Sequence, residues 1–533
     1  MTIRELDVLQ TDWIQNKHSR FVVCLVLVVL LIVGAWLFPE FAMLEIAIVG
    51  IGIPFLFFMW VRPEFGLLVL LFLTSSFVPA DIVDLRLPVG GLDLRDLVLL
   101  GMFGVLFARE IARKTLCIPW GRVGLLLFLF LVMALLSAFT AMFFQNVEHH
   151  WVLSDLRILC SYVVFFMVIW GIRKYDQLNV LLIGLFILVD LTTTIVILQQ
   201  FSGVDAPLLE AMLTTRDWQV DQVVGAVRVI PAGQVLMHFM WFIAVGILFY
   251  ARPSLHARFF YIFQIIYIGV GHILSYMRAQ WVSILIGAFL LGLLLLPRYW
   301  KTILKYLIPA VYALLIVVLG VVNFSRVDPY QIPFIVGIMD RFTSILSPAS
   351  TLQSSSLQWR EFENKKALEA IRKQPWIGVG LGGQYRELTT FQGESMGLWT
   401  RGSMAADQVT RFTRYVHNSY LSIAVKMGIP GLFVLIWCLV EFFLNGWKIY
   451  WTLPTSDLKG IVLGILAGFA GMFFWCFFHA HLIKAESTPV LGLMMGLVAV
   501  TGNLHKLGVG SKTKGIHPSR VPFRVTAREA KQI

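Results

Sequence analysis

The sequence predicts an all-α, polytopic integral membrane protein with about 12–14 transmembrane helices and one large extracytoplasmic helical loop. Three observations predict this fold class. The 533-residue chain is 58% hydrophobic and only 14% charged, whereas a soluble protein of this length needs far more charge to cover its surface. Its mean hydropathy is +0.80. Apolar runs long enough to cross a bilayer recur along most of the chain.

Charge, cysteine and histidine content exclude other classes. A net charge of +12 in so apolar a chain is typical of cytoplasmic loops of a membrane protein, and we expect no nucleic-acid partner. None of the five cysteines forms a CxxC pair, so neither a disulfide framework nor a zinc site is indicated. His479 and His481 supply only two potential ligands, so we predict no metal site and no cofactor.

The polar, basic N-terminus leads into an apolar run that other runs follow at once, which indicates a start-transfer helix. Two of the runs, 64–79 and 96–109, are short and could be re-entrant. The runs that we expect to cross the membrane are residues 21–38, 42–61, 64–79, 96–109, 122–144, 156–172, 177–200, 230–251, 258–276, 280–297, 303–323, 417–446, 459–480 and 486–503.

Basic residues predict the orientation, because cytoplasmic connections of membrane proteins are enriched in Lys and Arg. Outside the large loop, most basic residues fall in alternate connections and in the tail, so both termini should be cytoplasmic. Residues 80–95 should form a short acidic outer loop, and residues 201–228 a second, larger one. The predicted organisation is a cytoplasmic N-terminus (1–20), transmembrane helices with short loops (21–323), a large extracytoplasmic loop (324–416), C-terminal transmembrane helices (417–503) and a basic cytoplasmic tail near anionic lipid (504–533).

The large loop should contain a helix from Ser355 to about Lys373. Ser355 and Gln358 have the spacing of a capping box, and Pro375 helps to stop the helix. Helical periodicity predicts an inward face of Leu357, Arg360, Asn364, Ala367, Leu368 and Ile371. The opposite face holds Glu361, Lys365, Glu369 and Arg372.

Arg360 is the arginine on the inward face, and two interpretations of it are open. It could lie over apolar side chains or pair with a nearby carboxylate. Alternatively, its guanidinium could bind a phosphate through two parallel hydrogen bonds without ever losing its charge. The loop holds 11 basic and 8 acidic residues, so individual arginines matter more than its total charge.

The run PWIGVGLGGQY after this helix contains Gly378, Gly380, Gly382 and Gly383. Glycine-rich loops can bind phosphate through their backbone N–H groups, but this run does not match GxxxxGK[ST]. We therefore favour a tight turn where the loop folds back onto the membrane domain.

His417 and Asn418 begin the next apolar run, in the sequence HNSYL. An imidazole at the outer interface can take a proton from an alcohol near neutral pH, which makes His417 a candidate general base. A histidine with a purely structural hydrogen bond is the more frequent case. Asn418 could orient the imidazole or bind a sugar hydroxyl, and Gly428, Pro430 and Gly431 indicate a break in the following helix.

Further outer arginines are candidates as well. Arg278 lies in a tight connection between two apolar runs, where a charge needs a partner. Arg228 precedes the run that begins VIPAG, and Arg157 could simply pair with Asp155.

The order and spacing of these motifs between Ser354 and Leu432 resemble the O-antigen ligase/polymerase family of bacterial membrane glycosyltransferases. The matching residues are Arg360, Ala367, Leu368, Pro375, Gly378, Gly380, Gly382, the HNSYL motif from His417 to Leu421, and the GIPGL motif from Gly428 to Leu432.

The resemblance implies transfer of a glycan from an undecaprenyl-diphosphate carrier to an acceptor sugar hydroxyl on the outer face of the inner membrane. It also implies an inverting reaction without a metal ion, in which His417 activates the acceptor hydroxyl and Arg360 holds the carrier diphosphate. Arg278 resembles the family arginine of a short outer loop, although MRA stands here where SRG is commoner. The implied site consists of His417, Arg360 and Arg278 as catalytic residues and Arg228, Asn418 and Tyr420 as substrate-binding residues.

The acceptor distinguishes the alternatives within the family. It could be a growing polysaccharide, lipid A–core or a protein, and we favour a repeat-unit polymerase for an exopolysaccharide or O-antigen over an O-antigen ligase or a protein O-oligosaccharyltransferase. Membrane lipids and other polysaccharide assembly proteins are further expected partners. A transporter or flippase of lipid-linked sugar is the alternative from another class. It predicts charged residues at the membrane midplane, but few acidic residues lie in the middle of the apolar runs (Glu45, Asp190 and Glu441).

Overall fold

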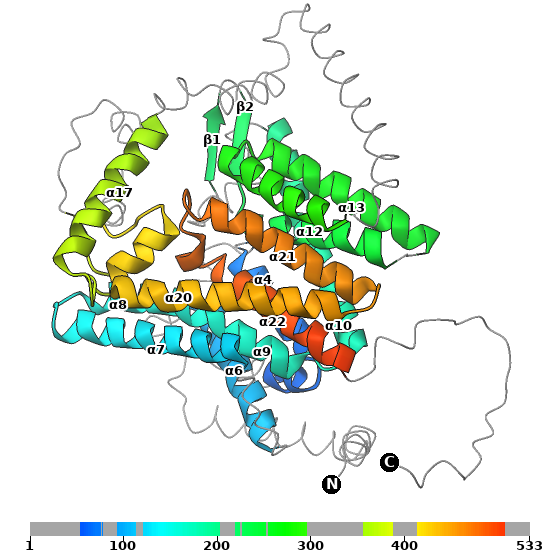
Figure 1. The fold of residues 1–533 in the computed structure, drawn as a ribbon, viewed down its shortest axis with the longest axis horizontal. Coiled ribbons are helices and arrows are strands. Elements are labelled where there is room, and N and C mark those ends of the chain that lie inside the picture. The colour runs from blue at the N-terminus through cyan, green and yellow to red at the C-terminus, as the bar shows by residue number, and fades with distance from the viewer. Residues whose placement is uncertain are drawn as a thin grey trace, which may run out of the picture.

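The computed structural model describes residues 54–75, 77, 93–112, 121–202, 219–223, 226–251, 254–295, 355–386 and 413–506. Helices make up most of this part of the chain and are gathered in one bundle (Figure 1). The predicted all-α, polytopic membrane fold is therefore confirmed.

Continuous apolar segments form the first half of the bundle. They are helical because the hydrocarbon core offers no water to backbone N–H and C=O groups, which must then bond within their own segment. The elements are α4 (Pro63–Thr74), α6 (Leu94–Ala112), α7 (Arg122–Phe143), α8 (His149–Cys160), the 3-10 turn η1 (Ser161–Val163), α9 (Val164–Gly171) and α10 (Tyr175–Ser202).

A short hairpin separates the two halves, with β1 at Gln219–Val223 and β2 at Ala226–Ile230. The strands are antiparallel, and Asp221 stands opposite Arg228 in the register. The predicted loop over 201–228 thus contains most of this hairpin, which the sequence analysis did not predict. Valine is frequent in both strands, and its branched side chain favours the extended backbone.

The second half contains the helices that carry most of the motifs named in the sequence between Ser354 and Leu432. Its elements are α12 (Gln234–Tyr250), α13 (Leu255–Leu274), a helix at Arg278–Leu295, α17 (Ser355–Lys373), α20 (Ser419–Thr452), α21 (Asp457–Trp475), the 3-10 turn η3 (His481–Ile483) and α22 (Thr488–Lys506). α21 packs closely against α12, since a Cβ added at Gly464 would lie 2.5 Å from the Cα of Ile243.

Eight helices among the described residues are long and apolar enough to cross a membrane. α4 and α12, with 12 and 17 residues, are shorter apolar helices, so the run expected at 64–79 is cut to Pro63–Thr74. The runs expected at 21–38 and 303–323 and both termini lie outside the described residues. The total of 12–14 spans, the domain boundaries and the orientation therefore stay predictions.

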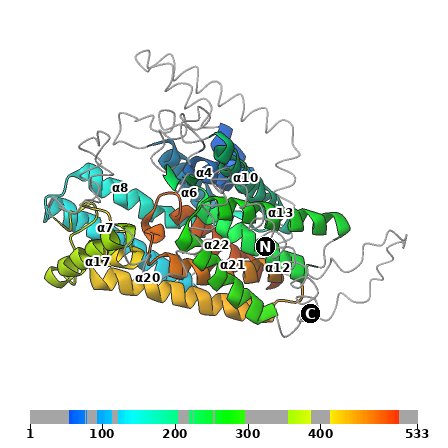
Figure 2. The same ribbon diagram turned by 90° about the horizontal axis from the view of Figure 1, so that it is seen from above.

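α17 lies at one end of the apolar bundle, near the start of α20 (Figures 1 and 2), and contacts that helix. Its bounds confirm the helix predicted from the capping box. The predicted inward face of α17 is wrong in part, because Glu363, Ala367 and Ala370 are buried whereas Leu368 is 45% exposed. The prediction positioned the face by its apolar residues, but a buried carboxylate with its own hydrogen-bond donors turns the helix toward Glu363.

Candidate active site

The first turn of α20 fixes the position of His417. Asn418 Oδ1 accepts hydrogen bonds from Tyr420 N at 3.0 Å and Leu421 N at 3.1 Å, the N-cap arrangement that asparagine favours. The Tyr420 hydroxyl donates to Phe473 O at 2.8 Å. Asn418 and Tyr420, both predicted to bind substrate, thus use these polar atoms to hold the helix start in place.

Ser419 ties the same point to the segment that follows α21. Its backbone N–H donates to Cys476 O at 2.8 Å, and its hydroxyl donates to His479 O at 2.7 Å. Hydrogen bonds therefore hold residues 417–419 against residues 476–479, at the end of the bundle where α20 begins and α21 ends.

α20 is broken at Gly428, where φ is 71° and ψ is 178°. The turn after α17 fills the break, because Ile429 N donates to Pro375 O at 2.8 Å and Val379 N donates to Val425 O at 2.7 Å. The break expected from Gly428 and its neighbours is confirmed. It is the place where the polar segment of residues 355–386 and 413–416, called here the outer segment after its predicted side, joins the membrane helices.

The glycine run forms the predicted tight turn. Gly378, Gly380 and Gly382 have φ values of 73°, 77° and 70°, a region that side chains disfavour. A Cβ at Gly382 would lie 2.6 Å from the backbone C of Trp151, and one at Gly380 would lie 2.6 Å from the Cβ of Ala141. The run is therefore a joint between the outer segment and α7 and α8.

Asp155 on α8 reinforces this joint. Its Oδ2 accepts a hydrogen bond from Gly382 N at 2.7 Å and forms an ion pair with Lys426, whose side chain is 7% exposed. The alternative that Arg157 pairs with Asp155 is wrong, because Arg157 pairs with Asp96 at 2.8 Å. Asp155 instead binds the buried ammonium group of Lys426 and the backbone N–H of Gly382, two donors that together stabilise its carboxylate.

The His417 imidazole contacts a carboxylate of α17. His417 Nδ1 lies 2.7 Å from Glu363 Oε2, and Trp359 Nε1 donates to Glu363 Oε1 at 2.8 Å. Glu363 is fully buried, while the His417 side chain is 27% exposed. The ring of Tyr415 lies edge-on, with its centre 5.0 Å from that of His417. The imidazole is thus held at one nitrogen and remains partly open to its surroundings.

Glu363 is the site residue that the sequence reasoning missed. It lies one helical turn after Arg360 and one turn before Ala367, on a stripe that continues to Ala370. The signal available in the sequence was its spacing, because Glu363 follows Arg360 by three positions and precedes Ala367 by four. This spacing is compatible with the inward face, but only the donors Trp359 and His417 make a buried carboxylate favourable there.

Arg360 lies over the same segment that Ser419 binds. Its guanidinium carbon is 6.0 Å from the ring centre of Phe478. The pKa of His479 lies well below its usual value. The largest cause is burial, followed by the charges of Arg360, His481, His417 and Lys484. Because Glu363, three residues after Arg360 on α17, contacts His417, the structure brings these two predicted residues to the same part of this helix.

Aromatic side chains surround the carboxylate. The Arg386 guanidinium carbon lies 4.8 Å from the Trp359 ring centre, 5.4 Å from that of Phe362 and 5.6 Å from that of Tyr385. The Tyr385 hydroxyl donates to Tyr415 O at 3.2 Å. Burial, followed by the negative charge of Glu363, raises the pKa of Tyr385. These groups pack around the part of α17 that carries Glu363.

Arg278 lies at the same end of the bundle. In helix 278–295, a Cβ at Gly287 would lie 2.6 Å from Ala467 O, and one at Gly471 on α21 would lie 2.9 Å from Ser283 Oγ. These two contacts align the helices antiparallel, which puts the half-buried Arg278 level with the C-terminal end of α21. The segment contacted by Arg360 begins directly after that end.

Arg228 lies in β2 of the hairpin and pairs with Asp221 of β1 in the strand register. β2 leads almost directly into α12. Only the backbone position of Arg228 is described.

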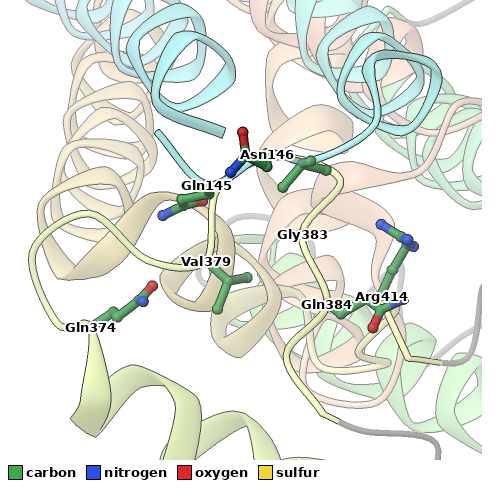
Figure 3. A pocket seen from close by; sticks show the side chains of 8 residues that line it. Gln145, Asn146, Gln374, Val379, Gly383, Gln384 and Arg414 are labelled. Atoms are coloured by element: carbon green, nitrogen blue, oxygen red, sulfur yellow. The ribbon is translucent and has the colours of Figure 1, made fainter. Parts of the chain in front are cut away.

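An open cavity of about 380 Å³ lies on the joint between the outer segment and α7 and α8 (Figure 3). Arg414 at its edge donates to Gly382 O and lies 4.6 Å from the Trp151 ring centre. The cavity is lined by Gln145, Asn146, Val147, Gln374, Val379, Gly383, Gln384 and Arg414, and so does not include His417 or Arg360. Within the described residues, no group of three or more His, Cys, Asp or Glu side chains is arranged to hold a metal ion.

The family comparison covers most of this site. Residues 263–436 match the family model described as O-antigen ligase, a range that includes Arg278, Arg360, Glu363, His417 and the break at Gly428. A comparison with curated proteins gives no match. Residues 263–436 are therefore similar to the O-antigen ligase family, and this match supports the resemblance to the O-antigen ligase/polymerase family.

Proposed function

We propose that the protein transfers a glycan from an undecaprenyl-diphosphate carrier to an acceptor sugar hydroxyl on the outer face of the bacterial inner membrane. We further propose that the acceptor is a growing exopolysaccharide or O-antigen chain, so that the enzyme acts as a repeat-unit polymerase. The family match supports a glycosyltransferase of this general type.

One observation carries the proposal: α17 presents a cationic group and an imidazole contact within one helical turn. Arg360 lies over Phe478, and three residues later Glu363 contacts His417. A permanently charged guanidinium suits the diphosphate of a leaving carrier, while a partly exposed imidazole suits a hydroxyl nucleophile. Arg278, at the same end of the bundle, supplies a second guanidinium.

The proposed reaction is a single displacement at the anomeric carbon. The acceptor oxygen attacks from the side opposite the diphosphate, the new C1–O bond forms as the old one breaks, and the configuration inverts. The acceptor proton moves to His417 Nε2. Undecaprenyl diphosphate leaves with the electron pair of the broken bond, and Arg360 and Arg278 stabilise the charge that develops on it.

The test uses purified full-length protein with an undecaprenyl-diphosphate oligosaccharide and candidate acceptors. His417→Ala should lower the transfer rate by about 10²–10⁴-fold, the usual contribution of a general base. Arg360→Ala should lower it by about 10²–10³-fold, as expected for one donor to a developing anion. Arg372→Ala is the matched control, because Arg372 lies on the exposed part of the same helix. A folded His417→Ala protein that transfers glycan at the parental rate would refute the proposal.

The products distinguish the alternatives. Release of undecaprenyl diphosphate with lengthening glycan products indicates a polymerase, whereas a single transfer to lipid A–core indicates a ligase and a glycosylated polypeptide indicates a protein O-oligosaccharyltransferase. Movement of lipid-linked sugar across vesicles without a new glycosidic bond would instead support the transporter.

A further inference from the structure

A buried carboxylate outside the predicted site contacts the predicted base. Glu363 is fully buried, and the hydrogen bonds described for it come from three donors. They are Trp359 Nε1 at 2.8 Å, His417 Nδ1 at 2.7 Å and His417 N at 3.4 Å. An acidic side chain is almost never fully buried unless it is paired, so this one has a specific role to explain.

The contact decides which imidazole nitrogen is available. An ionised carboxylate only accepts hydrogen bonds, so the 2.7 Å contact requires that His417 Nδ1 carries the hydrogen. In the neutral imidazole the lone pair is then on Nε2. Because Glu363 also accepts from the backbone N–H of His417, it fixes the position of the residue as well as the rotation of its ring.

We propose that Glu363 is the positioning residue of the site, which holds His417 in the Nδ1–H tautomer and stabilises the imidazolium that forms when the acceptor hydroxyl loses its proton. This inference rests on the proposed glycosyl transfer. The O–H bond of the acceptor breaks, its proton binds His417 Nε2, and its oxygen forms the bond to the anomeric carbon. Glu363 stays ionised throughout, and the proton later leaves Nε2 for water.

The surroundings of Glu363 fit this role. Trp359 donates to the carboxylate oxygen that His417 does not use, and Arg386 lies over the Trp359 ring. Both oxygens are thus held in place before substrate binds, which is what a positioning group requires. Glu363 and Tyr415 contact His417 directly, and His479 interacts with it electrostatically. The charged and titratable groups that interact with these three neighbours are Arg360, Tyr385, His481, Lys484 and Glu486.

The test compares Glu363→Gln, Glu363→Asp and Glu369→Gln in the transfer assay. Glutamine keeps the volume and the contact with Trp359 but removes the charge and can donate to Nδ1, which favours the wrong tautomer. We expect kcat to fall about 10³–10⁴-fold in Glu363→Gln with the KM for the lipid donor unchanged. Glu363→Asp should recover part of the loss. Glu369 pairs with Lys366 on the exposed side, so Glu369→Gln should behave as the parent.

Two further readouts separate positioning from a merely structural role. Without the carboxylate the imidazolium is less stable, so the limb of the pH–rate profile that rises with pH should move to lower pH in Glu363→Gln. ¹⁵N NMR of histidine-labelled protein should show the hydrogen on Nδ1 of His417 in the parent and a changed tautomer in the variant.

The outcomes also separate this inference from the proposed function. Parental kcat, pH profile and tautomer in Glu363→Gln, with His417→Ala inactive, would overturn the role of Glu363 and leave the glycosyl transfer standing. An active His417→Ala would instead remove the proposed function. If Glu363→Gln does not fold, the ¹⁵N spectrum of the parent decides, because a hydrogen on Nε2 of His417 instead of Nδ1 would also overturn the inference.

Discussion

Gly428→Ala should destabilise the protein at the point where the outer segment joins the membrane helices. Gly428 has a φ of 71° and a ψ of 178°, a region that is essentially restricted to glycine and costs another residue about 1–3 kcal/mol. The added Cβ would also lie 2.5 Å from the backbone C of Trp376 and 2.9 Å from Ile377 N. Backbone atoms cannot rotate away as a side chain can, so the turn itself must shift, at about 1–2 kcal/mol more.

The two contributions together predict a loss of about 2–5 kcal/mol in the free energy of unfolding. Since the displaced turn follows α17, which carries Arg360 and Glu363, glycan transfer should fall as well. The assay is thermal unfolding in one detergent at a fixed scan rate, followed by transfer measured well below the transition.

Gly104→Ala is the matched control. Gly104 lies within α6 and has no heavy atom within 4 Å of an added Cβ, so alanine should raise stability by up to about 1 kcal/mol. A Gly428→Ala protein with the parental unfolding temperature would refute the argument from the φ angle and the close backbone contact.

Three further predictions concern stability, pH and orientation. Asp155→Asn should cost about 3 kcal/mol because it leaves the Lys426 ammonium buried without its partner, and adding Lys426→Met should restore part of this loss in thermal unfolding. The pKa of His479 is lowered from 6.5 in the folded state by burial and by Arg360, so its contribution to stability is complete above about pH 6.5 and declines as the pH falls. Between pH 7.5 and pH 5 the unfolding temperature should therefore decrease more in the parent protein than in His479→Gln. Equal decreases would contradict the lowered pKa of His479. In spheroplasts, Arg372→Cys should react with a membrane-impermeant maleimide, whereas Lys448→Cys should react only after permeabilisation; the reverse pattern would invert the predicted orientation.

The helices and their local signals could be predicted from the sequence, because each depends on residues close together in the chain. A run of apolar residues must be helical in a bilayer, whatever it packs against. The capping box predicted the bounds of α17, and the glycines predicted the turn that ends it. The break at Gly428 also followed from local composition.

The hairpin at Gln219–Ile230 and the inward face of α17 could not be predicted in this way. Strand pairing depends on a partner segment, and the rotation of a helix depends on the surface that it meets. Leu368 is apolar but exposed, while Glu363 is charged but buried, because the donors Trp359 and His417 compensate the carboxylate.

The sequence by itself therefore determined a helical membrane protein with Arg360 and His417 as candidate site residues on either side of a polar segment. Only the tertiary structure decided that Glu363 meets His417 across 54 positions and that Lys426 meets Asp155 across 271. The physical reason is that a hydrogen bond or ion pair between distant residues depends on how helices pack, and residue spacing along the chain does not carry that information.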